Sequence, residues 1–129
     1  MEITLTNMCL IVDSEGRILV QNRVKKDWPG LTFPGGHVQN EESSFDSVIR
    51  EIKEETGLSL NSLSPVGFYE WLGAKRELSL LFFSDDYSGT LHSSSEGEVF
   101  FIRPEDLSRY PWSVDFDRIL KVYGAFFKR

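Results

Sequence analysis

Three glutamates at helical spacing are the residues of this sequence best suited to chemistry. Glu51, Glu54 and Glu55 stand within the short segment 50–58. A helix turns by about 100° per residue, so Glu54 and Glu55 fall about 60° and about 40° to either side of Glu51. Like charges at this spacing destabilise a helix by roughly 0.2–0.5 kcal/mol per pair. Because hard divalent cations bind clustered carboxylate oxygens, the pattern predicts a Mg²⁺ or Mn²⁺ site.

The segment around these glutamates has the signals of a helix with two different faces. Ser43 or Ser44 can cap its start, and Gly57 stands where a helix usually ends. Apolar residues lie beside the acidic stripe on the helical wheel, so one side should pack on a core while the other faces an open cleft. These apolar residues are Phe45, Val48, Ile49 and Ile52.

Segment 36–58 resembles the signature of a known family. It matches the Nudix box, Gly-x5-Glu-x7-Arg-Glu-U-x-Glu-Glu-x-Gly-U with U aliphatic, at every defined position. A charge run is usually a solvated helix face, but that interpretation explains neither the preceding Gly35-Gly36 pair nor the Arg50-Glu51 step. The chain therefore resembles the Nudix hydrolases. The matching residues are Gly36, Glu42, Arg50, Glu51, Ile52, Glu54, Glu55, Gly57 and Leu58.

The resemblance implies a reaction and a set of site residues. Nudix hydrolases cleave a nucleoside diphosphate linked to another group, and water attacks one phosphorus of the pyrophosphate unit. Metal ions can neutralise the charge that develops on the phosphoryl oxygens. The implied metal ligands are Glu51, Glu54, Glu55 and the carbonyl oxygen of Gly35. Glu51 is alternatively, or in addition, the general base, and Arg50 is expected to orient Glu51.

A further carboxylate from beyond the box often joins such sites. Glu98, directly before an apolar segment, is the first candidate for this catalytic and metal-binding role. Glu96 is the second candidate. The alternative is that both are solvated loop charges.

Segment 28–38 resembles the MutT-like branch of the family, which is associated with 8-oxo-dGTP. This resemblance implies hydrolysis of a nucleoside triphosphate to a nucleoside monophosphate and pyrophosphate. Dinucleotides and nucleotide sugars stay open as substrates, and so does a non-catalytic domain that senses a nucleotide. Members that act on ADP-ribose tend to carry a proline some way past the box, and this chain has none between Pro65 and Pro104.

Base recognition should lie outside the box, because the box contacts only the metal and the phosphates that all such substrates share. Four aromatic residues could stack on a base, Trp28, Phe33, Trp71 and Trp112, with Phe33 and Trp112 as the first choices. Asp115, or alternatively Asp117, could accept hydrogen bonds from purine N–H groups. The other interpretation is that the aromatic residues pack in the core and that Ser113 or Asp115 caps a helix.

The periodicity of the chain predicts an α/β fold, with a mixed sheet and helices on both faces. A turn signal between segments 3–12 and 18–24 predicts that these two strands form a hairpin. The Nudix resemblance implies an α/β/α sandwich, and we expect one domain over residues 1–129. Further expected elements are paired strands at 63–72 and 77–83, a strand at 98–102 and a C-terminal helix that starts within 112–115.

Composition restricts the partners of the chain. The formal net charge of −6 argues against a nucleic-acid polymer, because surfaces that bind such polymers are usually basic. Cys9, the single cysteine, is expected to be buried and suits a reducing compartment. No apolar run is long enough for a membrane span, so we expect a cytoplasmic protein. Nudix proteins are often dimers, which makes a homodimer a further expectation. Arg23, Lys25 and Lys26 could hold outer phosphates or form a solvated loop.

Overall fold

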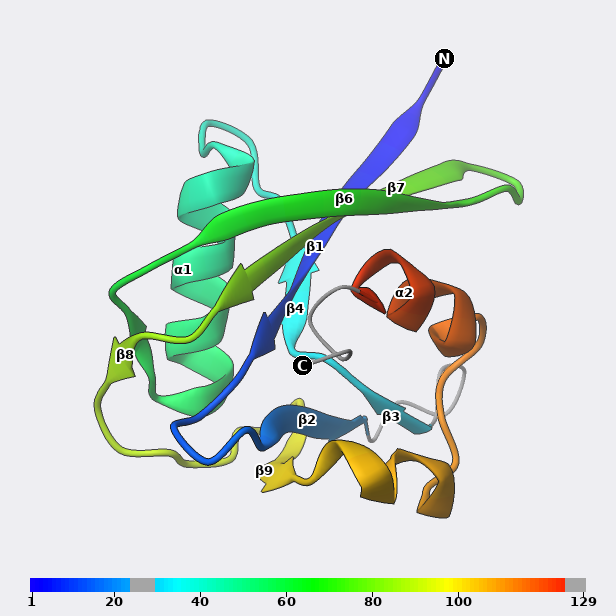
Figure 1. Cartoon of the computed structure of the whole chain (residues 1–129). Helices are drawn as coiled ribbons and strands as arrows, with labels where there is room; N and C mark the ends of the chain where they lie inside the picture. Colours follow the sequence, from blue (N-terminus) through cyan, green and yellow to red (C-terminus); the bar gives the residue numbers. More distant parts are fainter. Residues whose placement is uncertain (24–29, 125–129) are drawn as a thin grey trace.

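A mixed four-stranded sheet is the central element of the fold (Figure 1). The computed structural model describes residues 1–23 and 30–124, and the strand order of this sheet is β4-β1-β7-β6. β1 runs parallel to β7, whereas the β1–β4 and β6–β7 pairs are antiparallel. The predicted pairing of segments 63–72 and 77–83 is thus confirmed. The strands are β4 (Gly35–His37), β1 (Ile3–Ile11), β7 (Arg76–Ser84) and β6 (Ser64–Trp71).

A second sheet packs beside the first and has the strand order β3-β2-β9. β2 lies in its middle and is antiparallel to both neighbours. The strand predicted at 98–102 is confirmed as β9. The strands of this sheet are β3 (Gly30–Thr32), β2 (Ile18–Arg23) and β9 (Gly97–Ile102), and a separate short pair is formed by β5 (Ser59–Leu60) and β8 (Tyr87–Ser88).

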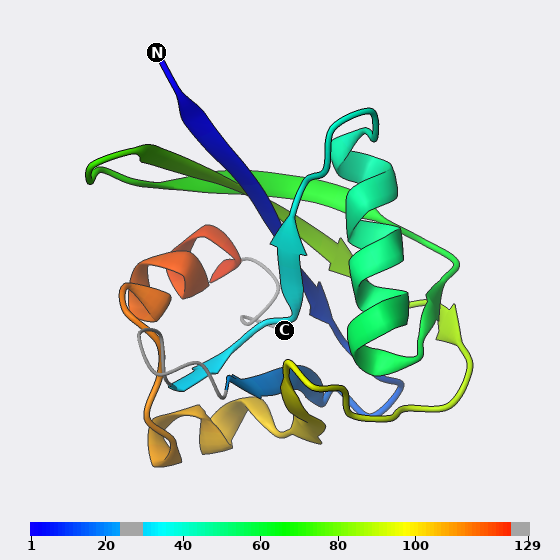
Figure 2. The same cartoon turned by 180° about the vertical axis from the view of Figure 1, so that it is seen from behind.

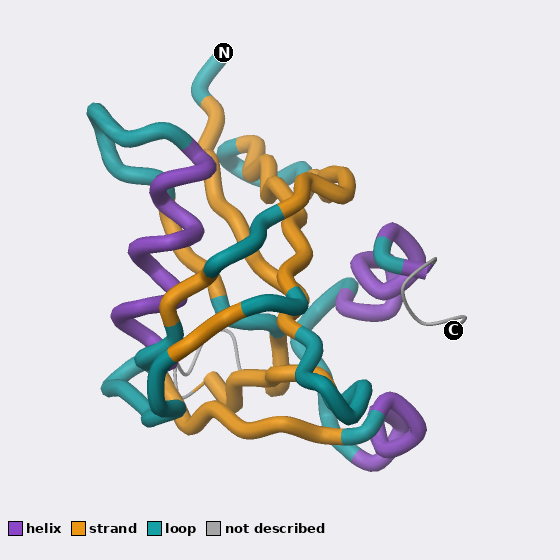
Figure 3. Tube along the Cα trace, turned by 60° about the vertical axis from the view of Figure 1, so that its left-hand side comes forward, coloured by secondary structure: helices purple, strands orange, loops and turns teal. Residues whose placement is uncertain are grey.

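Helices lie on both sides of the strands. Figure 3 shows α1 (Ser44–Thr56) on one side, and α2 (Phe116–Val122) with the 3₁₀ helix η1 (Pro104–Arg109) on the other. Figure 2 shows the same division from behind. This arrangement confirms the predicted α/β fold, a Nudix-type α/β/α sandwich with a mixed sheet. Within residues 1–23 and 30–124, no helix is both long enough and apolar enough to cross a bilayer.

The hairpin predicted between β1 and β2 is reduced to its turn, where Val12 and Ile18 form one antiparallel bridge. β1 pairs with β4 and β7, whereas β2 pairs with β3 and β9. The cause is that β1 is apolar on both faces: Cys9 and Leu10 point to opposite sides, and each is 0% exposed. A strand with two buried faces is stable between two partner strands, with packing layers above and below. A two-stranded hairpin would leave one of these faces in water.

The alternation along β1 divides the interior into two cores. Leu10 packs with Phe33 and Tyr123 on the side that α2 covers. Cys9 packs with Val48 and Ile52 on the α1 side. The burial of Cys9 is as predicted, and it raises the pKa of the thiol far above its usual range, so Cys9 acts as a small packing residue.

The ends of α1 follow from its sequence. The Ser43 hydroxyl oxygen accepts a hydrogen bond from the backbone N–H of Asp46 at 3.0 Å, which is an N-cap contact. Gly57 ends the helix with φ at 80°, in the left-handed region that favours glycine. The predicted inward face is confirmed at Val48 and Ile52, both 0% exposed. Phe45 differs, since it is 47% exposed and lies edge-on to Phe82 of the core.

Candidate active site

A cavity of about 410 Å³ lies at the β4 edge of the four-stranded sheet. Gly35 and Gly36 of the edge strand β4 line the cavity where it passes from the α1 side of the sheet to the α2 side. α1 contributes Glu51 and Glu55, which reach the cavity past this glycine edge. The cavity therefore joins the acidic face of α1 to the α2 side of the sheet. On that second side it is lined by Thr6, Trp71, Glu77, Ser79 and Ile119.

The two glycines are required by the close approach of neighbouring groups. A Cβ atom on Gly36 would lie 2.5 Å from the carboxyl carbon of Glu51, and a Cβ on Gly35 would lie 2.1 Å from the carbonyl oxygen of Asn7. No side chain fits at Gly35, where the clash is with backbone, and a side chain at Gly36 would displace the carboxylate of Glu51. The Gly-Gly step of the motif thus lets the carboxylate of Glu51 lie directly against the backbone of β4.

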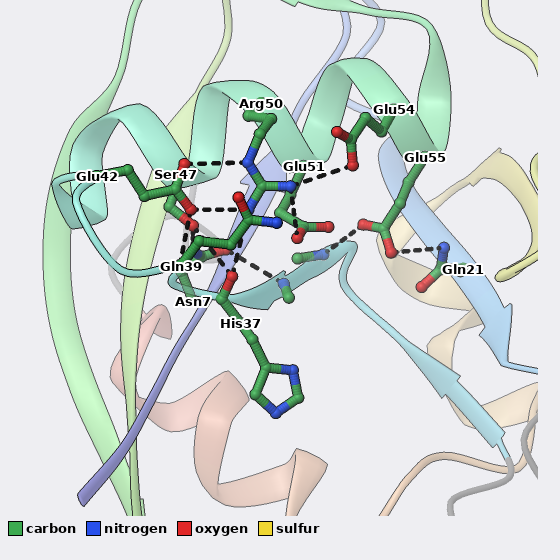
Figure 4. Close-up of polar contacts among 12 residues, drawn as sticks. Asn7, Gln21, His37, Gln39, Glu42, Ser47, Arg50, Glu51, Glu54 and Glu55 are labelled. Carbon is green, nitrogen blue, oxygen red and sulfur yellow. Dashed lines mark hydrogen bonds and ion pairs between the residues drawn. The ribbon is translucent and has the colours of Figure 1, made fainter.

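Arg50 holds three carboxylates of the motif together, as Figure 4 shows. Its guanidinium binds Glu42 through two hydrogen bonds of 2.8 and 3.0 Å. Its Nη1 lies 3.1 Å from Glu51 and 3.1 Å from Glu54. The hydrogen bond from Arg50 and a backbone N–H of Gln39 lower the pKa of Glu42 to about 2. Arg50 is therefore placed to orient Glu51, with Glu42 fixing the guanidinium from behind.

Glu55 is the most buried acidic group of the site, at 5% exposure. Its carboxylate accepts hydrogen bonds from the backbone N–H of Gly35 at 3.1 Å and from the Gln21 amide at 3.5 Å. Burial, and then repulsion from Glu51, raise the pKa of Glu55 to about 8 despite these donors. Burial also raises the pKa of Glu51, against the opposing effect of Arg50. Two carboxylates are thus held in a poorly hydrated place where their charges repel.

The carboxylate set fits a hard divalent cation. No described Lys or Arg forms an ion pair with Glu55, so its buried charge lacks a compensating cation from the protein residues described. In the described part of the chain, no three His, Cys, Asp or Glu side chains already gather around one point at metal-binding distance. Arg50 instead holds Glu51 and Glu54 in ion pairs. Carboxylate and backbone oxygens are the donors that Mg²⁺ and Mn²⁺ prefer.

The carboxylate from beyond the box that reaches this site is Glu96, the second candidate. Glu96 lines the cavity and raises the pKa of both Glu51 and Glu55 by repulsion. Glu98, the first candidate, is exposed, and it pairs in register with Asn22 on β2. The preference for Glu98 assumed that a strand holds a side chain rigidly towards the cleft. Glu98 does lie in a strand. Its neighbours Gly97 and Val99 are buried, so the alternation of the strand directs the Glu98 side chain away from the cleft.

Of the residues predicted to contact the base, Phe33 and Trp71 line the cavity, whereas Trp112 and Asp115 do not. Phe33 lines the cavity, but most of its ring is buried, edge-on to Phe116 and Tyr123. Trp112 stacks on Phe116 with ring centroids 4.1 Å apart, and its indole N–H donates to the carbonyl of Leu107. Trp112 lies outside the cavity lining, which is where a base would have to stack.

Asp115 also lies outside the cavity lining. It occupies the N-cap position of α2 with φ at 63°, and its side chain makes no capping hydrogen bond. The structure therefore supports the helix-start interpretation of this residue, although its backbone rather than its side chain forms the turn. Of the other residues considered in the sequence, Trp28, Lys25 and Lys26 lie outside the described residues.

Two amide side chains that hold the site were not recognised from the sequence. Gln21 contacts Glu55, as described above. Asn7 donates to the Ser47 hydroxyl at 2.9 Å and accepts from the backbone N–H of Gly36 at 3.3 Å, so it joins β4 to α1. Both amides are buried, at 4% and 3% exposure, and each directly adjoins a buried apolar residue of its strand, Val20 or Met8. A buried amide needs hydrogen-bond partners, and this was the signal available in the sequence.

The fold and the site together define the class of the protein, a small α/β domain with an acidic helix beside a substrate-sized cavity. A family model, the NUDIX domain, matches residues 4–122. The chain belongs to the Nudix family. The resemblance found in segment 36–58 is thus confirmed over nearly the whole chain.

Three relatives illustrate the range of this similarity. YtkD of Bacillus subtilis, provisionally assigned as an 8-oxo-dGTP diphosphatase, is 37% identical over 62% of this chain and 54% of its own length. The CTP pyrophosphohydrolase of Escherichia coli is 29% identical over 78% of this chain and 77% of its own length. The ADP-ribose pyrophosphatase of Methanocaldococcus jannaschii is 32% identical over 88% of this chain and 69% of its own length. The chain thus spans about half the length of YtkD.

Solved structures share the fold at lower sequence identity. The solution structure of the E. coli ORF135 protein has a TM-score of 0.84 and 23% identity, and the match covers 99% of this chain and 93% of the other. A MutT protein from Methanosarcina mazei has a TM-score of 0.84 and 21% identity, with 98% and 96% covered. These likenesses establish the fold.

Proposed function

We propose that this protein is a Mg²⁺-dependent hydrolase of nucleoside triphosphates, which releases a nucleoside monophosphate and pyrophosphate, with 8-oxo-dGTP as the leading substrate. The observation that carries the proposal is the continuity of the cavity. Glu51 and Glu55 line one end, and Thr6, Trp71 and Ser79 line the other. A nucleotide has the matching shape, with a polyphosphate at one end and a flat base at the other. The similarity to YtkD supports the choice of substrate.

The residues of α1 supply the chemistry in this proposal. Glu51, Glu54, Glu55 and the carbonyl of Gly35 would hold the metal. A Mg²⁺ ion held by these oxygens would neutralise charge on the phosphoryl oxygens and help to align the attacking and leaving oxygens. Glu51 is, instead of or besides a metal ligand, the general base that accepts the proton of the attacking water. Arg50, 3.1 Å away, keeps its carboxylate oriented.

Arg23 provides a positive charge in the proposed site in addition to the metal ion. It stands at the end of β2 and lines the cavity, which also contains Glu51, Glu55 and Glu96. Those carboxylates repel a polyphosphate, so a guanidinium is needed near the phosphates that the metal does not neutralise. Its planar set of donors suits phosphate oxygens. We assign Arg23 to the outer phosphates.

Two other substrates follow from the relatives. The ADP-ribose pyrophosphatase and the CTP pyrophosphohydrolase are similar over most of this chain. A nucleoside diphosphate linked to a sugar, or a pyrimidine triphosphate, is therefore the alternative. A domain that binds nucleotides without cleaving them is a weaker alternative, because all glutamates of the motif are present.

The experiment is a substrate panel of 8-oxo-dGTP, dGTP, CTP and ADP-ribose, with Mg²⁺, with Mn²⁺ and with EDTA. We expect turnover with either metal and none in EDTA. Pyrophosphate released from 8-oxo-dGTP, with the highest kcat/KM of the panel, supports the proposal. Preferential cleavage of ADP-ribose or CTP establishes an alternative, and binding without turnover of any compound indicates a nucleotide sensor.

The cellular compartment and the oligomeric state of the protein are also proposed. The single cysteine, Cys9, is buried and free, which suits the reducing cytoplasm. A homodimer remains a prediction from the family resemblance, and light scattering of the purified chain tests it.

A further inference from the structure

Ser79 has a buried hydroxyl group for which no described residue provides a hydrogen-bond partner. Its exposed fraction is 1%, and its Oγ atom is unpaired. The residue nevertheless lines the cavity. Buried polar groups are nearly always paired, because an unpaired one costs free energy. A polar group of a ligand in the cavity would provide the missing partner.

The strand register places Ser79 at a definite distance from the phosphate end of the site. Ser79 of β7 is in register with Thr6 of β1, and Thr6 is in register with His37 of β4. Neighbouring strands lie about 4.8 Å apart, so Ser79 is about 10 Å from β4 across the sheet. A ribose can bridge this gap. A nucleotide whose phosphates lie beside Gly35 and Gly36 would therefore place its base at Ser79.

Glu77 adds a carboxylate at the same end of the cavity. It precedes Ser79 by two residues on β7, so both side chains point to the same face. It lines the cavity, and its Oε2 lies 3.5 Å from the Thr6 hydroxyl, which donates to it. Trp71 is its register partner on β6 and lines the cavity beside it. This end thus combines a flat aromatic ring, a hydroxyl and a carboxylate.

The charge of Glu77 restricts what it can contact. A carboxylate only accepts hydrogen bonds, and it repels phosphate. Its partner in a bound nucleotide must therefore be a donor, which is either a ribose hydroxyl or an N–H group of the base. The distance of about 10 Å from β4 across the sheet favours the base. Two adjacent N–H groups would match its two oxygens.

We propose that Glu77 and Ser79 select the base of the substrate, and that they favour a guanine-type base. This inference rests on the proposed function, since it assigns the base end of the same site. Guanine presents the N1–H and the 2-amino group side by side, and 8-oxoguanine retains both. Adenine and cytosine present a ring-nitrogen acceptor beside an amino group, which would place a lone pair against the carboxylate. Trp71 provides the stacking surface, and Ser79 hydrogen-bonds the neighbouring polar atom of the base.

The test compares binding of dGMP, dAMP and dCMP to the whole protein by isothermal titration calorimetry. These monophosphates carry the base without requiring turnover, so the measurement does not depend on the hydrolytic reaction. The variants are Glu77→Gln and Ser79→Ala. The control is Glu70→Gln, which makes the same substitution on the neighbouring strand β6. Glu70 precedes Trp71, so its side chain points to the opposite face of the sheet, where it pairs with Arg76.

Wild type should bind dGMP at least tenfold more tightly than dAMP or dCMP, which is the range expected of a hydrogen bond to a charged group. Glu77→Gln should reduce that preference by about tenfold or more, because an amide places a donor against one of the two N–H groups and can instead bind adenine. Ser79→Ala should weaken dGMP binding by about threefold to tenfold while leaving Tm unchanged or higher. That combination separates a ligand contact from a structural role.

Three results would overturn the inference. Wild type could bind the three monophosphates equally or not at all, Glu77→Gln could leave their ratio unchanged, or Glu70→Gln could change the ratio as much as Glu77→Gln. Failure of the proposed function has a different signature. In that case the substrate panel shows no turnover, whereas the preference for dGMP and its loss in Glu77→Gln are still measured.

Discussion

The carboxylate of Glu55 accepts a hydrogen bond from the backbone N–H of Gly35 at 3.1 Å. This contact joins the acidic face of α1 to the edge strand β4, and it holds the carboxylate in a place with little water. Burial and the neighbouring Glu51 keep the pKa of Glu55 at about 8. The site therefore contains an acid that is protonated at neutral pH unless a cation binds, and this has consequences for stability and for activity.

The stability of the metal-free protein should fall as pH rises. An unfolded glutamate ionises near pH 4.5, whereas folded Glu55 ionises near pH 8, so between these values the folded state holds a proton that the unfolded state has lost. The free energy of unfolding then decreases from about pH 4.5 to about pH 8 and is level above. Urea denaturation in EDTA across this range measures it. Glu55→Gln should reduce the fall and leave the contribution of Glu51, whose pKa is also raised. Parallel curves for the variant and wild type would contradict the assignment.

Removal of a metal ligand should reduce turnover without unfolding the protein. We expect Glu54→Gln and Glu55→Gln each to lower kcat by roughly 10²-fold or more, equivalent to about 3 kcal/mol. In EDTA at pH 8, Tm should be unchanged for Glu54→Gln and higher for Glu55→Gln, which removes a buried charge. Glu105→Gln, at an exposed residue of η1, is the control. Normal kcat with a lowered Tm would mean that these glutamates are structural.

Substitution of Glu96 should lower kcat more than substitution of Glu98. Both residues are exposed, but Glu96, just before β9, lines the cavity, whereas Glu98, within β9, does not. Glu96→Gln should therefore lower kcat by about tenfold or more, and Glu98→Gln should leave it within a factor of about two. Steady-state kinetics at saturating Mg²⁺ decide between them. A larger loss at Glu98 would restore the expectation drawn from the sequence.

Arg50 and Glu42 should act as one positioning unit. Arg50→Lys keeps the charge but loses the planar pair of hydrogen bonds to Glu42. We expect Arg50→Lys and Glu42→Gln each to lower kcat by about tenfold with little change in KM. The double variant should lose no more than the larger single loss, because both changes release the same guanidinium. Additive losses in this double-mutant cycle would show that the two residues act independently.

Trp112 should contribute to stability and leave substrate choice unchanged. Its stacking on Phe116 and its hydrogen bond to Leu107 place it between η1 and α2. Trp112→Ala should lower the free energy of unfolding by about 3 kcal/mol, and Trp112→Phe by less. The ratio of kcat/KM for 8-oxo-dGTP and dGTP should stay constant in both variants. A changed ratio would return Trp112 to the base-binding site.

The sequence by itself determined the acidic helix and its family. The spacing of Glu51, Glu54 and Glu55, the capping Ser43 and the terminal Gly57 lie within fifteen consecutive positions of the chain. Interactions at such short separations follow from helix geometry alone. The paired strands β6 and β7 were also predictable, since a turn joins them directly.

Only the tertiary structure decided which distant residues complete the site. Gln21 and Glu55 are 34 positions apart, and Thr6 and Glu77 are 71 apart. β1 was expected in a hairpin, and its central place in the sheet brings Thr6 into register with Ser79. The choice of Glu96 over Glu98 depends on the face to which one strand position points. These relationships are set by sheet order and register, which result from the burial of all apolar faces together and not from the spacing within any one segment.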